Sequence, residues 1–187
     1  RFGKDRAGDV ALLRELCTEY GFSVDVIPPQ EVDHDVVSSS SIRALLQDEG
    51  AVQQANVRLG RPYQLQGTVA RGEGRGRQIG FPTANLALDD ARKLVPKRGV
   101  YATRVQLPGG RYCGGMMNIG RRPTFDGMDV TAEVHLLNFE GDLYGEHLSV
   151  QFLQRLRDEQ RFESAEALAA QLSKDEQRCT AVVEAAT

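Results

Sequence analysis

GVYATRVQLPGGRYCGGMMNIG, residues 99–120, is the stretch that decides the fold class. It holds two segments in which apolar and polar residues alternate, and the turn-forming run Pro108-Gly109-Gly110 separates them. Alternation with a period of two is typical of β-strands that have one face in a core. Comparable segments, each bounded by Gly, Pro, Asn or Asp, occupy residues 63–72, 130–139 and 148–156. Five or six short strands at this spacing predict a small antiparallel barrel or sandwich.

A helix is predicted to close this region. Apolar residues between Ser164 and about Val183 form one helical stripe, consisting of Leu168, Leu172, Cys179, Val182 and Val183. A stripe of this kind is typical of an amphipathic helix that packs on a sheet.

The first 60 residues have a different pattern. Residues 9–20 carry apolar side chains at helical spacing, with Asp9 as a candidate N-cap and Gly21 just past the end, so they predict a helix. Residues 22–27 alternate before Pro28-Pro29 and predict a short strand. A helix followed by a strand suggests the tail of an α/β unit.

Two short helices are expected next, and they lead to the predicted domain boundary. Serines 38–41 can cap a helix that stops at Gly50, and a second helix covers residues 51–60. We therefore expect an incomplete α/β segment over residues 1–60 and the strand-rich domain over residues 61–187.

The composition of the chain differs from that of disordered and collagen-like proteins. With 41% apolar and 26% charged residues, the chain has an ordinary globular composition. It has neither an apolar run of roughly 20 residues nor a signal pattern, so we expect a cytoplasmic protein. The cysteines, at positions 17, 113 and 179, are widely spaced and are expected to be reduced. The three histidines form no metal-binding pattern, so we expect no zinc site.

Charge is distributed unevenly along the chain. The net charge is −3, but residues 58–122 carry 13 basic and 3 acidic side chains, a local net charge of +10. A basic block of this kind suits nucleic acid, a small polyanion such as a nucleoside triphosphate, or the acidic remainder of the same protein.

GEGRGRQIGFPTANL, residues 72–86, carries the strongest chemical signal. Its glycines would let the backbone approach a phosphate chain, and arginines 71, 75 and 77 could add charge-assisted contacts. The pattern is neither a Walker A loop nor a dinucleotide fingerprint. On the residues alone, a phosphate-binding loop and a flexible hairpin both remain open.

Residues 80–85, Gly-Phe-Pro-Thr-Ala-Asn, resemble the characteristic motif of riboflavin kinases. Further stretches over residues 63–180 occur in that family's order: Gly99-Val100-Tyr101-Ala102, Asn118-Ile119-Gly120, Pro123-Thr124-Phe125, Glu133-Val134-His135, Asp142-Leu143-Tyr144-Gly145, Leu156-Arg157 and Phe162. The resemblance implies a Greek-key-like six-stranded antiparallel barrel with a C-terminal helix. It also implies Mg²⁺-dependent transfer of the ATP γ-phosphate to the 5′-hydroxyl of riboflavin, which gives FMN and ADP.

The resemblance assigns roles to particular residues. Thr83 and Asn85 would be Mg²⁺ ligands, and Glu133 would be the general base. On the residues alone, Thr83 and Asn85 fit an ordinary turn after a proline better than a metal site. Glu133 likewise fits a solvated residue better than a base, on a strand's polar face with Thr131 and His135. The family positions for ATP are Gly72, Arg77, Leu136, Asn138 and Tyr144. Those for the flavin are Arg157, Gln160 and Phe162. Arg77 and Gln160 stand where other members carry lysine.

The N-terminal part resembles a second module. RFGKDRAGD, residues 1–9, and VSSSSIR, residues 37–43, are similar to the closing motifs of the FMN adenylyltransferase module in bacterial bifunctional riboflavin kinase/FAD synthetases. There Ser38 to Arg43 would correspond to a motif that helps to hold nucleotide phosphates. Because that module's early HxGH-type site is not in the chain, we expect no FAD synthesis.

Two other functions remain open from the sequence. The basic middle third and the Gly/Arg loop also fit a nucleic-acid-binding barrel, although the low aromatic content of 6% offers few bases a stacking platform. A regulatory domain that binds a flavin without phosphorylating it is the other alternative. The expected partners are the small molecules riboflavin and ATP, without nucleic acid or membrane, and a monomer is favoured.

Overall fold

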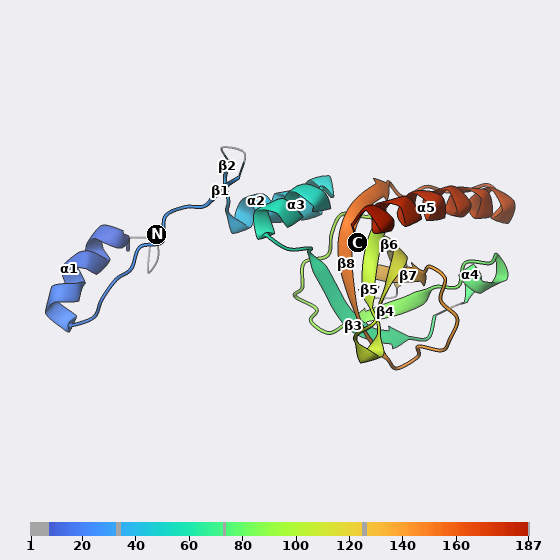
Figure 1. The fold of residues 1–187 in the computed structure, drawn as a ribbon, viewed down its shortest axis with the longest axis horizontal. Helices are drawn as coiled ribbons and strands as arrows, with labels where there is room; N and C mark the ends of the chain where they lie inside the picture. The colour runs from blue at the N-terminus through green and yellow to red at the C-terminus, as the bar shows by residue number, and fades with distance from the viewer. Residues whose placement is uncertain (1–7, 33–34, 73, 125–126, 187) are drawn as a thin grey trace. The chain divides into compact units, whose positions relative to one another are not determined.

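The computed structural model describes residues 8–32, 35–72, 74–124 and 127–186, and the chain forms two compact units, Arg1–Val37 and Ser38–Thr187 (Figure 1). Most of the RFGKDRAGD motif and Phe125 of the Pro-Thr-Phe motif lie outside the described residues.

The first unit contains the predicted N-terminal helix. Helix α1, Val10–Tyr20, begins where the Asp9 side chain accepts a hydrogen bond from the Leu12 amide at 3.0 Å. It ends at Gly21, whose φ of 65° is a left-handed conformation that glycine adopts at no steric cost. The helix prediction is confirmed, and the local caps explain both ends.

The strand predicted at residues 22–27 is wrong. The described strands of this unit are β1, Glu31–Val32, and β2, Asp35–Val36, which pair with each other in antiparallel fashion. A strand requires a hydrogen-bonded neighbour, which alternation alone does not provide. Three apolar side chains of this segment are exposed, Phe22, Val26 and Ile27, the last by 83%.

The second unit starts with two short helices. Ser38 caps helix α2, Ser39–Ala44, which continues into the π-helical turn η2, Leu45–Glu49. Helix α3, Val52–Leu59, follows and ends at Gly60. Four side chains of these helices join the main core, namely Leu45, Leu46, Val52 and Ala55. The compact unit consequently includes residues 38–60, which precede the predicted module boundary.

Six strands form a closed antiparallel barrel, so the predicted fold class is confirmed. They are β3 (Gln64–Ala70), β4 (Ala84–Leu88), β5 (Gly99–Gln106), β6 (Tyr112–Thr124), β7 (Gly127–Leu136) and β8 (His147–Arg157). Around the barrel the order is β3-β4-β7-β6-β5-β8. β4 and β7, which are distant in sequence, are therefore neighbours. A four-residue helix, α4, Arg75–Gln78, lies in the glycine loop between β3 and β4.

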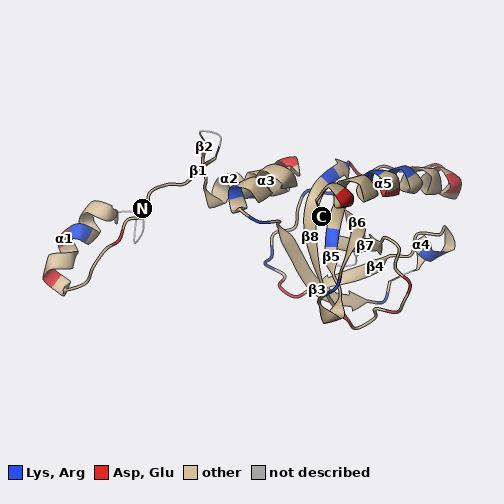
Figure 2. Ribbon diagram, in the orientation of Figure 1, with Lys and Arg blue, Asp and Glu red and all other residues tan. Residues whose placement is uncertain are grey.

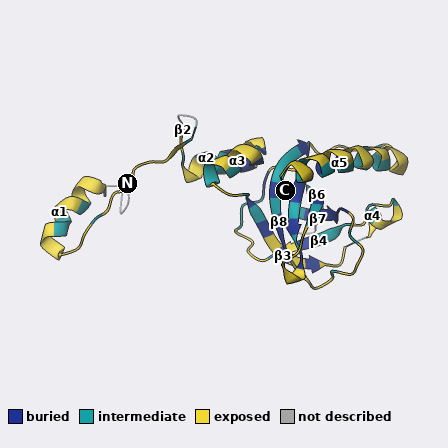
Figure 3. Ribbon diagram, in the orientation of Figure 1, coloured by how far each residue is buried: buried dark blue, intermediate teal, exposed yellow. Residues whose placement is uncertain are grey.

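The barrel interior holds the main core, and helix α5 covers part of its outside. Tyr101 and Phe152 are fully buried inside, with ring centroids 5.2 Å apart in an edge-to-face arrangement. Helix α5, Ala165–Ala185, is capped by Ser164 and packs on β5, β6 and β8. Its Cys179 belongs to a second apolar cluster with Val100, Ala102, Met116, Leu137 and Leu156. Figure 3 shows the resulting concentration of buried residues in the strands.

Helix α5 carries acidic and basic side chains along its length, and further basic residues lie in α4 and β8 (Figure 2).

No helix in the described part of the chain combines the length and the apolar character needed to cross a bilayer.

Candidate active site

The pairing of β4 with β7 brings the predicted metal ligands next to the predicted base. Asn85 is the register partner of Glu133, and Ala84 is that of Val134. The Thr83 hydroxyl Oγ1 donates a hydrogen bond to Glu133 Oε2 at 3.2 Å. All three side chains are partly buried. Residues 50 positions apart in sequence thus form one small polar cluster.

Gly72 lies directly against this cluster. It follows β3, whose Ala70 pairs with Asn85. A Cβ atom at position 72 would overlap the Asn85 amide group, so a side chain there would displace Asn85. The predicted ATP residue Gly72 and the predicted metal ligand Asn85 are therefore in contact, and a larger residue at position 72 would fit only if the Asn85 side chain moved.

A polar surface continues from Glu133 across β7 and β6. Asn118 of β6 is the register partner of Glu133 on the side away from β4. A Cβ built on Gly120 would lie 2.8 Å from Glu159 Oε1, 3.0 Å from Thr131 Oγ1 and 3.4 Å from Asn118 Nδ2. Three polar side chains thus gather over the bare backbone of Gly120. They lead from Glu133 towards the segment that follows β8.

His135 differs from the expectation of an open polar face. Its side chain is buried, and its Nδ1 lies 2.8 Å from the Pro82 carbonyl oxygen. The Phe81 ring contacts it edge-on at 5.4 Å between centroids. Because a carbonyl oxygen only accepts, Nδ1 carries a proton and donates it. His135 therefore holds the backbone immediately before Thr83.

A pocket of about 90 Å³ adjoins Thr83 and includes several predicted ATP residues. Its lining is Val69, Arg77, Pro82, Thr83, Ala84, Val134, Leu136, Phe139, Gly141, Asp142, Leu143 and Tyr144. The Tyr144 ring lies 5.7 Å from the Arg71 guanidinium, a cation–π contact at the rim. Asn138, with a φ of 51°, lines a neighbouring groove of about 340 Å³ that shares Phe139 with this pocket.

The predicted flavin residues do not all face the same way. The Arg157 guanidinium lies over the Phe162 ring at 5.8 Å and also pairs with Asp175, whose Oδ2 is 2.7 Å from Arg157 Nε. Gln160 is exposed and instead lines an open groove of about 1350 Å³, bordered by Arg98, Arg121 and other basic residues. This larger groove includes none of Thr83, Asn85 and Glu133. It carries carboxylates of its own, from Asp48, Asp158 and Glu159, so Gln160 and the Thr83–Glu133 cluster border different parts of the barrel unit.

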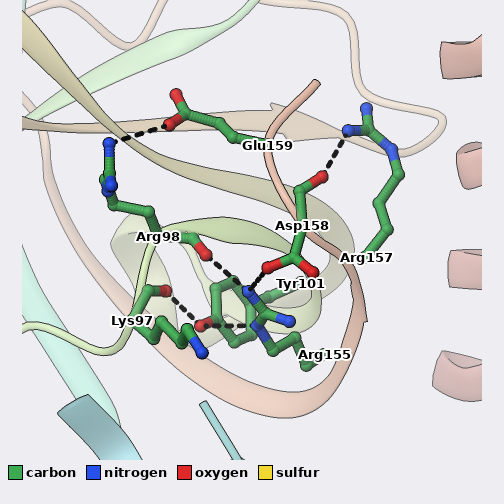
Figure 4. A network of polar contacts seen from close by, with 7 residues as sticks. All are labelled: Lys97, Arg98, Tyr101, Arg155, Arg157, Asp158 and Glu159. Atoms are coloured by element: carbon green, nitrogen blue, oxygen red, sulfur yellow. Dashed lines mark hydrogen bonds and ion pairs between the residues drawn. The ribbon is translucent and has the colours of Figure 1, made fainter. Parts of the chain in front are cut away.

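A network of polar contacts holds the segment that follows β8 against the barrel (Figure 4). Arg155 Nη2 donates to the Arg98 carbonyl oxygen at 2.6 Å and to Asp158 Oδ1 at 2.7 Å. The hydrogen bond from Arg155 holds the pKa of the Asp158 carboxyl below its usual value. Arg98 Nη1 lies 3.8 Å from Glu159 Oε2. The network thus fixes the chain that leads to Gln160 and Phe162.

The donor atoms at Thr83 and Asn85 fit a hard cation such as Mg²⁺. A hydroxyl and an amide oxygen are ligands of the type that Mg²⁺ takes, and Mg²⁺ commonly relies on few protein ligands together with water and substrate phosphates. Among the described residues, His, Cys, Asp and Glu side chains form no group of three that could hold a metal.

Sequence reasoning did not assign Asn118, Thr131, Glu159 or His135 to the site. Asn118 and His135 belong to quoted motifs, so their position in those motifs was an available signal. Glu159 had none, because only the fold brings its loop over Gly120.

Comparisons with known proteins find matches in both parts of the chain. The riboflavin kinase family model matches residues 59–183, and the FAD synthetase family model matches residues 1–41. Bifunctional riboflavin kinase/FMN adenylyltransferases from Escherichia coli K12 and Haemophilus influenzae are 41% and 38% identical to the chain. Each alignment covers 94% of this chain but 55% and 56% of the respective relative. The chain therefore spans about half the length of the curated relatives it matches.

A solved structure shares the fold over nearly the whole chain. It bears the name macrolide-efflux protein, from Streptococcus pneumoniae, and superposes with a TM-score of 0.81 at 37% identity, covering 94% of this chain and 56% of that one. Since the riboflavin kinase model covers more than half of the chain, including every strand of the barrel and the Thr83–Glu133 cluster, the chain belongs to the riboflavin kinase family.

Proposed function

We propose that this chain is a riboflavin kinase that transfers the γ-phosphate of ATP to the 5′-hydroxyl of riboflavin and releases FMN and ADP. The observation that carries the proposal is the Thr83–Glu133 hydrogen bond, which joins a candidate metal ligand to a candidate base. Family membership and the relatives' names support the choice of substrates.

Glu133 is the group that would accept the proton. As the 5′-oxygen forms its bond to the γ-phosphorus, its proton passes to the Glu133 carboxylate, and the bond from that phosphorus to the bridging oxygen breaks to release ADP. A strand position with neighbours on both sides keeps this carboxylate in place. The base then needs little reorganisation before transfer.

Thr83 and Asn85 would hold Mg²⁺ through their side-chain oxygens. When bound, the ion neutralises negative charge on the phosphates during transfer. The hydrogen bond that Thr83 now donates to Glu133 is compatible with this role, because it leaves the lone pairs of the hydroxyl oxygen available as acceptors.

The nucleotide would occupy the pocket beside Thr83. Gly72 allows the backbone to approach the phosphates, and Arg77 supplies positive charge to them. Leu136, Asn138 and Tyr144 would contact the rest of ATP. Tyr144 is 48% exposed, so a nucleotide could cover its ring.

The flavin would lie on the other side of Glu133, along the polar surface over Gly120. Phe162 and Arg157 offer an aromatic face and a guanidinium at its end. Gln160, on the adjoining groove, would contact the flavin from the same segment.

Product analysis tests the proposal. The protein is incubated with riboflavin, ATP and Mg²⁺, and flavins are separated by chromatography. We expect FMN to appear in equal amount to ADP, and an absence of FMN would refute the kinase. The same chromatogram tests the prediction that no FAD forms. The expected cytoplasmic location and monomeric state stay predictions.

A further inference from the structure

Helix α5 reaches two sides of the candidate active site through neighbouring acidic residues. Consecutive residues of an α-helix point about 100° apart, so they face different surroundings. Asp175 faces Arg157 at the end of β8, whereas Glu176 faces His135 on β7. Neither acid has a role in the proposed reaction.

Asp175 fixes the Arg157 guanidinium. Its side chain is fully buried, and its Oδ2 lies 2.7 Å from Arg157 Nε while its Oδ1 accepts a hydrogen bond from Gln171 Nε2 at 2.9 Å. A buried carboxylate is costly unless both oxygens are satisfied, as they are here. Arg157 is thereby held in one orientation, over the Phe162 ring.

Contacts from the barrel hold the segment that follows β8, in addition to the contact from helix α5. Arg157 Nη1 donates to the Asp158 carbonyl oxygen at 2.9 Å, and Arg155 holds the Asp158 side chain (Figure 4). These barrel-side contacts fix the backbone. Asp175 instead acts on the guanidinium that the proposed function assigns to the flavin.

Glu176 acts on the other side, through His135. Its Oε1 lies 3.7 Å from His135 Nε2, and His135 Nδ1 donates to the Pro82 carbonyl oxygen at 2.8 Å. Pro82 immediately precedes Thr83, whose hydroxyl contacts Glu133. When Nε2 is protonated as well, the imidazolium ring lies between the Glu176 carboxylate, at ion-pair distance, and the backbone of the candidate metal segment.

We propose that Asp175 and Glu176 are positioning residues with separate tasks. Asp175 orients Arg157 for the flavin, and Glu176 orients His135 and thereby the Thr83 segment for the metal and nucleotide. Helix α5 thus positions protein groups at both substrate sites. The inference rests on the proposed function but concerns residues that contact neither substrate.

Steady-state kinetics with riboflavin, ATP and Mg²⁺ varied in turn test the two tasks. Asp175→Asn should raise the KM for riboflavin about tenfold, the change expected for loss of one charge-assisted hydrogen bond, with the Mg²⁺ dependence unchanged. Glu176→Gln should raise the Mg²⁺ concentration for half-maximal rate by about threefold, less than the roughly tenfold or more for loss of a direct partner of a metal ligand. It should leave the riboflavin KM unchanged.

Further variants keep the test decisive. Glu166→Gln makes the same carboxylate-to-amide change as Glu176→Gln at an exposed position of α5 and should alter neither parameter. If Asp175→Asn fails to fold, Gln171→Met weakens the same support without leaving a buried charge unpaired, and it should raise the riboflavin KM in the same direction. Quenching of riboflavin fluorescence without ATP measures flavin affinity separately from turnover.

The outcomes separate the inference from the proposed function. Parallel changes of both parameters in both variants, or lower thermal stability with neither parameter changed, would show a merely structural role and overturn the inference while wild-type kinase activity stands. If the wild-type protein makes no FMN, the proposed function itself fails.

Discussion

Helices α1 and α5 have similar local signals but different surroundings. Each begins at a side chain that caps its first turn, Asp9 for α1 and Ser164 for α5. Helix α5 buries Asp175 and Cys179 against the barrel, whereas none of the residues of α1 is buried (Figure 3). Local sequence therefore predicts where a helix begins and ends, but the stability of the helix depends chiefly on what it packs against.

The comparison predicts that truncating an apolar side chain lowers the free energy of unfolding far more in the barrel than in α1. Phe152→Ala removes a fully buried ring that contacts Tyr63 and Tyr101, and should lower the free energy of unfolding of the barrel unit by about 3–5 kcal/mol. Leu12→Ala, at a position 37% exposed on α1, should change it by less than about 0.5 kcal/mol. Denaturant titration measures both. Equal losses would break the distinction between the two units.

Removing the helix caps tests the same difference between α1 and α5. Ser164→Ala deletes the oxygen that accepts a hydrogen bond from the Ala167 amide at 3.2 Å, and should cost the barrel unit about 1 kcal/mol. Asp9→Ala removes the equivalent bond in α1 and should lower helix content without moving the barrel's unfolding transition. If Asp9→Ala shifted that transition as far as Ser164→Ala, α1 would contribute to the stability of the barrel.

Acid should weaken the network that follows β8. The pKa of Asp158 is lowered in the folded protein, chiefly by the hydrogen bond from Arg155. Its stabilising contribution is thus fully present above the unfolded pKa of about 4 and is lost as pH falls through the lower folded value. The difference in unfolding free energy between wild type and Asp158→Asn should be constant near neutral pH and shrink below about pH 4. A difference that stays constant down to pH 2 would contradict the pairing.

Much of the fold was readable from the sequence because its signals are local. Alternating segments marked most of the barrel, and Asp9, Gly21, Gly50 and Gly60 marked helix ends. The strand predicted at residues 22–27 failed because pairing is not a local property. Strand β4 was not marked by alternation, since it is short and begins within a motif that also resembles a turn.

The candidate site was predictable only as a set of separate positions. The family resemblance named Thr83, Asn85 and Glu133, and the β4–β7 pairing brings them together. It did not reveal that Arg157 is already engaged by Asp175, because a buried ion pair between a strand and a distant helix has no signature in spacing.

The rate of FMN formation by matched variants tests the central claim most directly. Glu133→Gln replaces the candidate base with a group of the same size, and Glu31→Gln makes the same change in β1 of the first unit. We expect wild type and Glu31→Gln to form FMN at the same rate and Glu133→Gln to be slower by roughly 10²-fold or more, with its unfolding transition preserved. Glu133→Gln forming FMN at the wild-type rate, or no FMN from wild type, would contradict the claim.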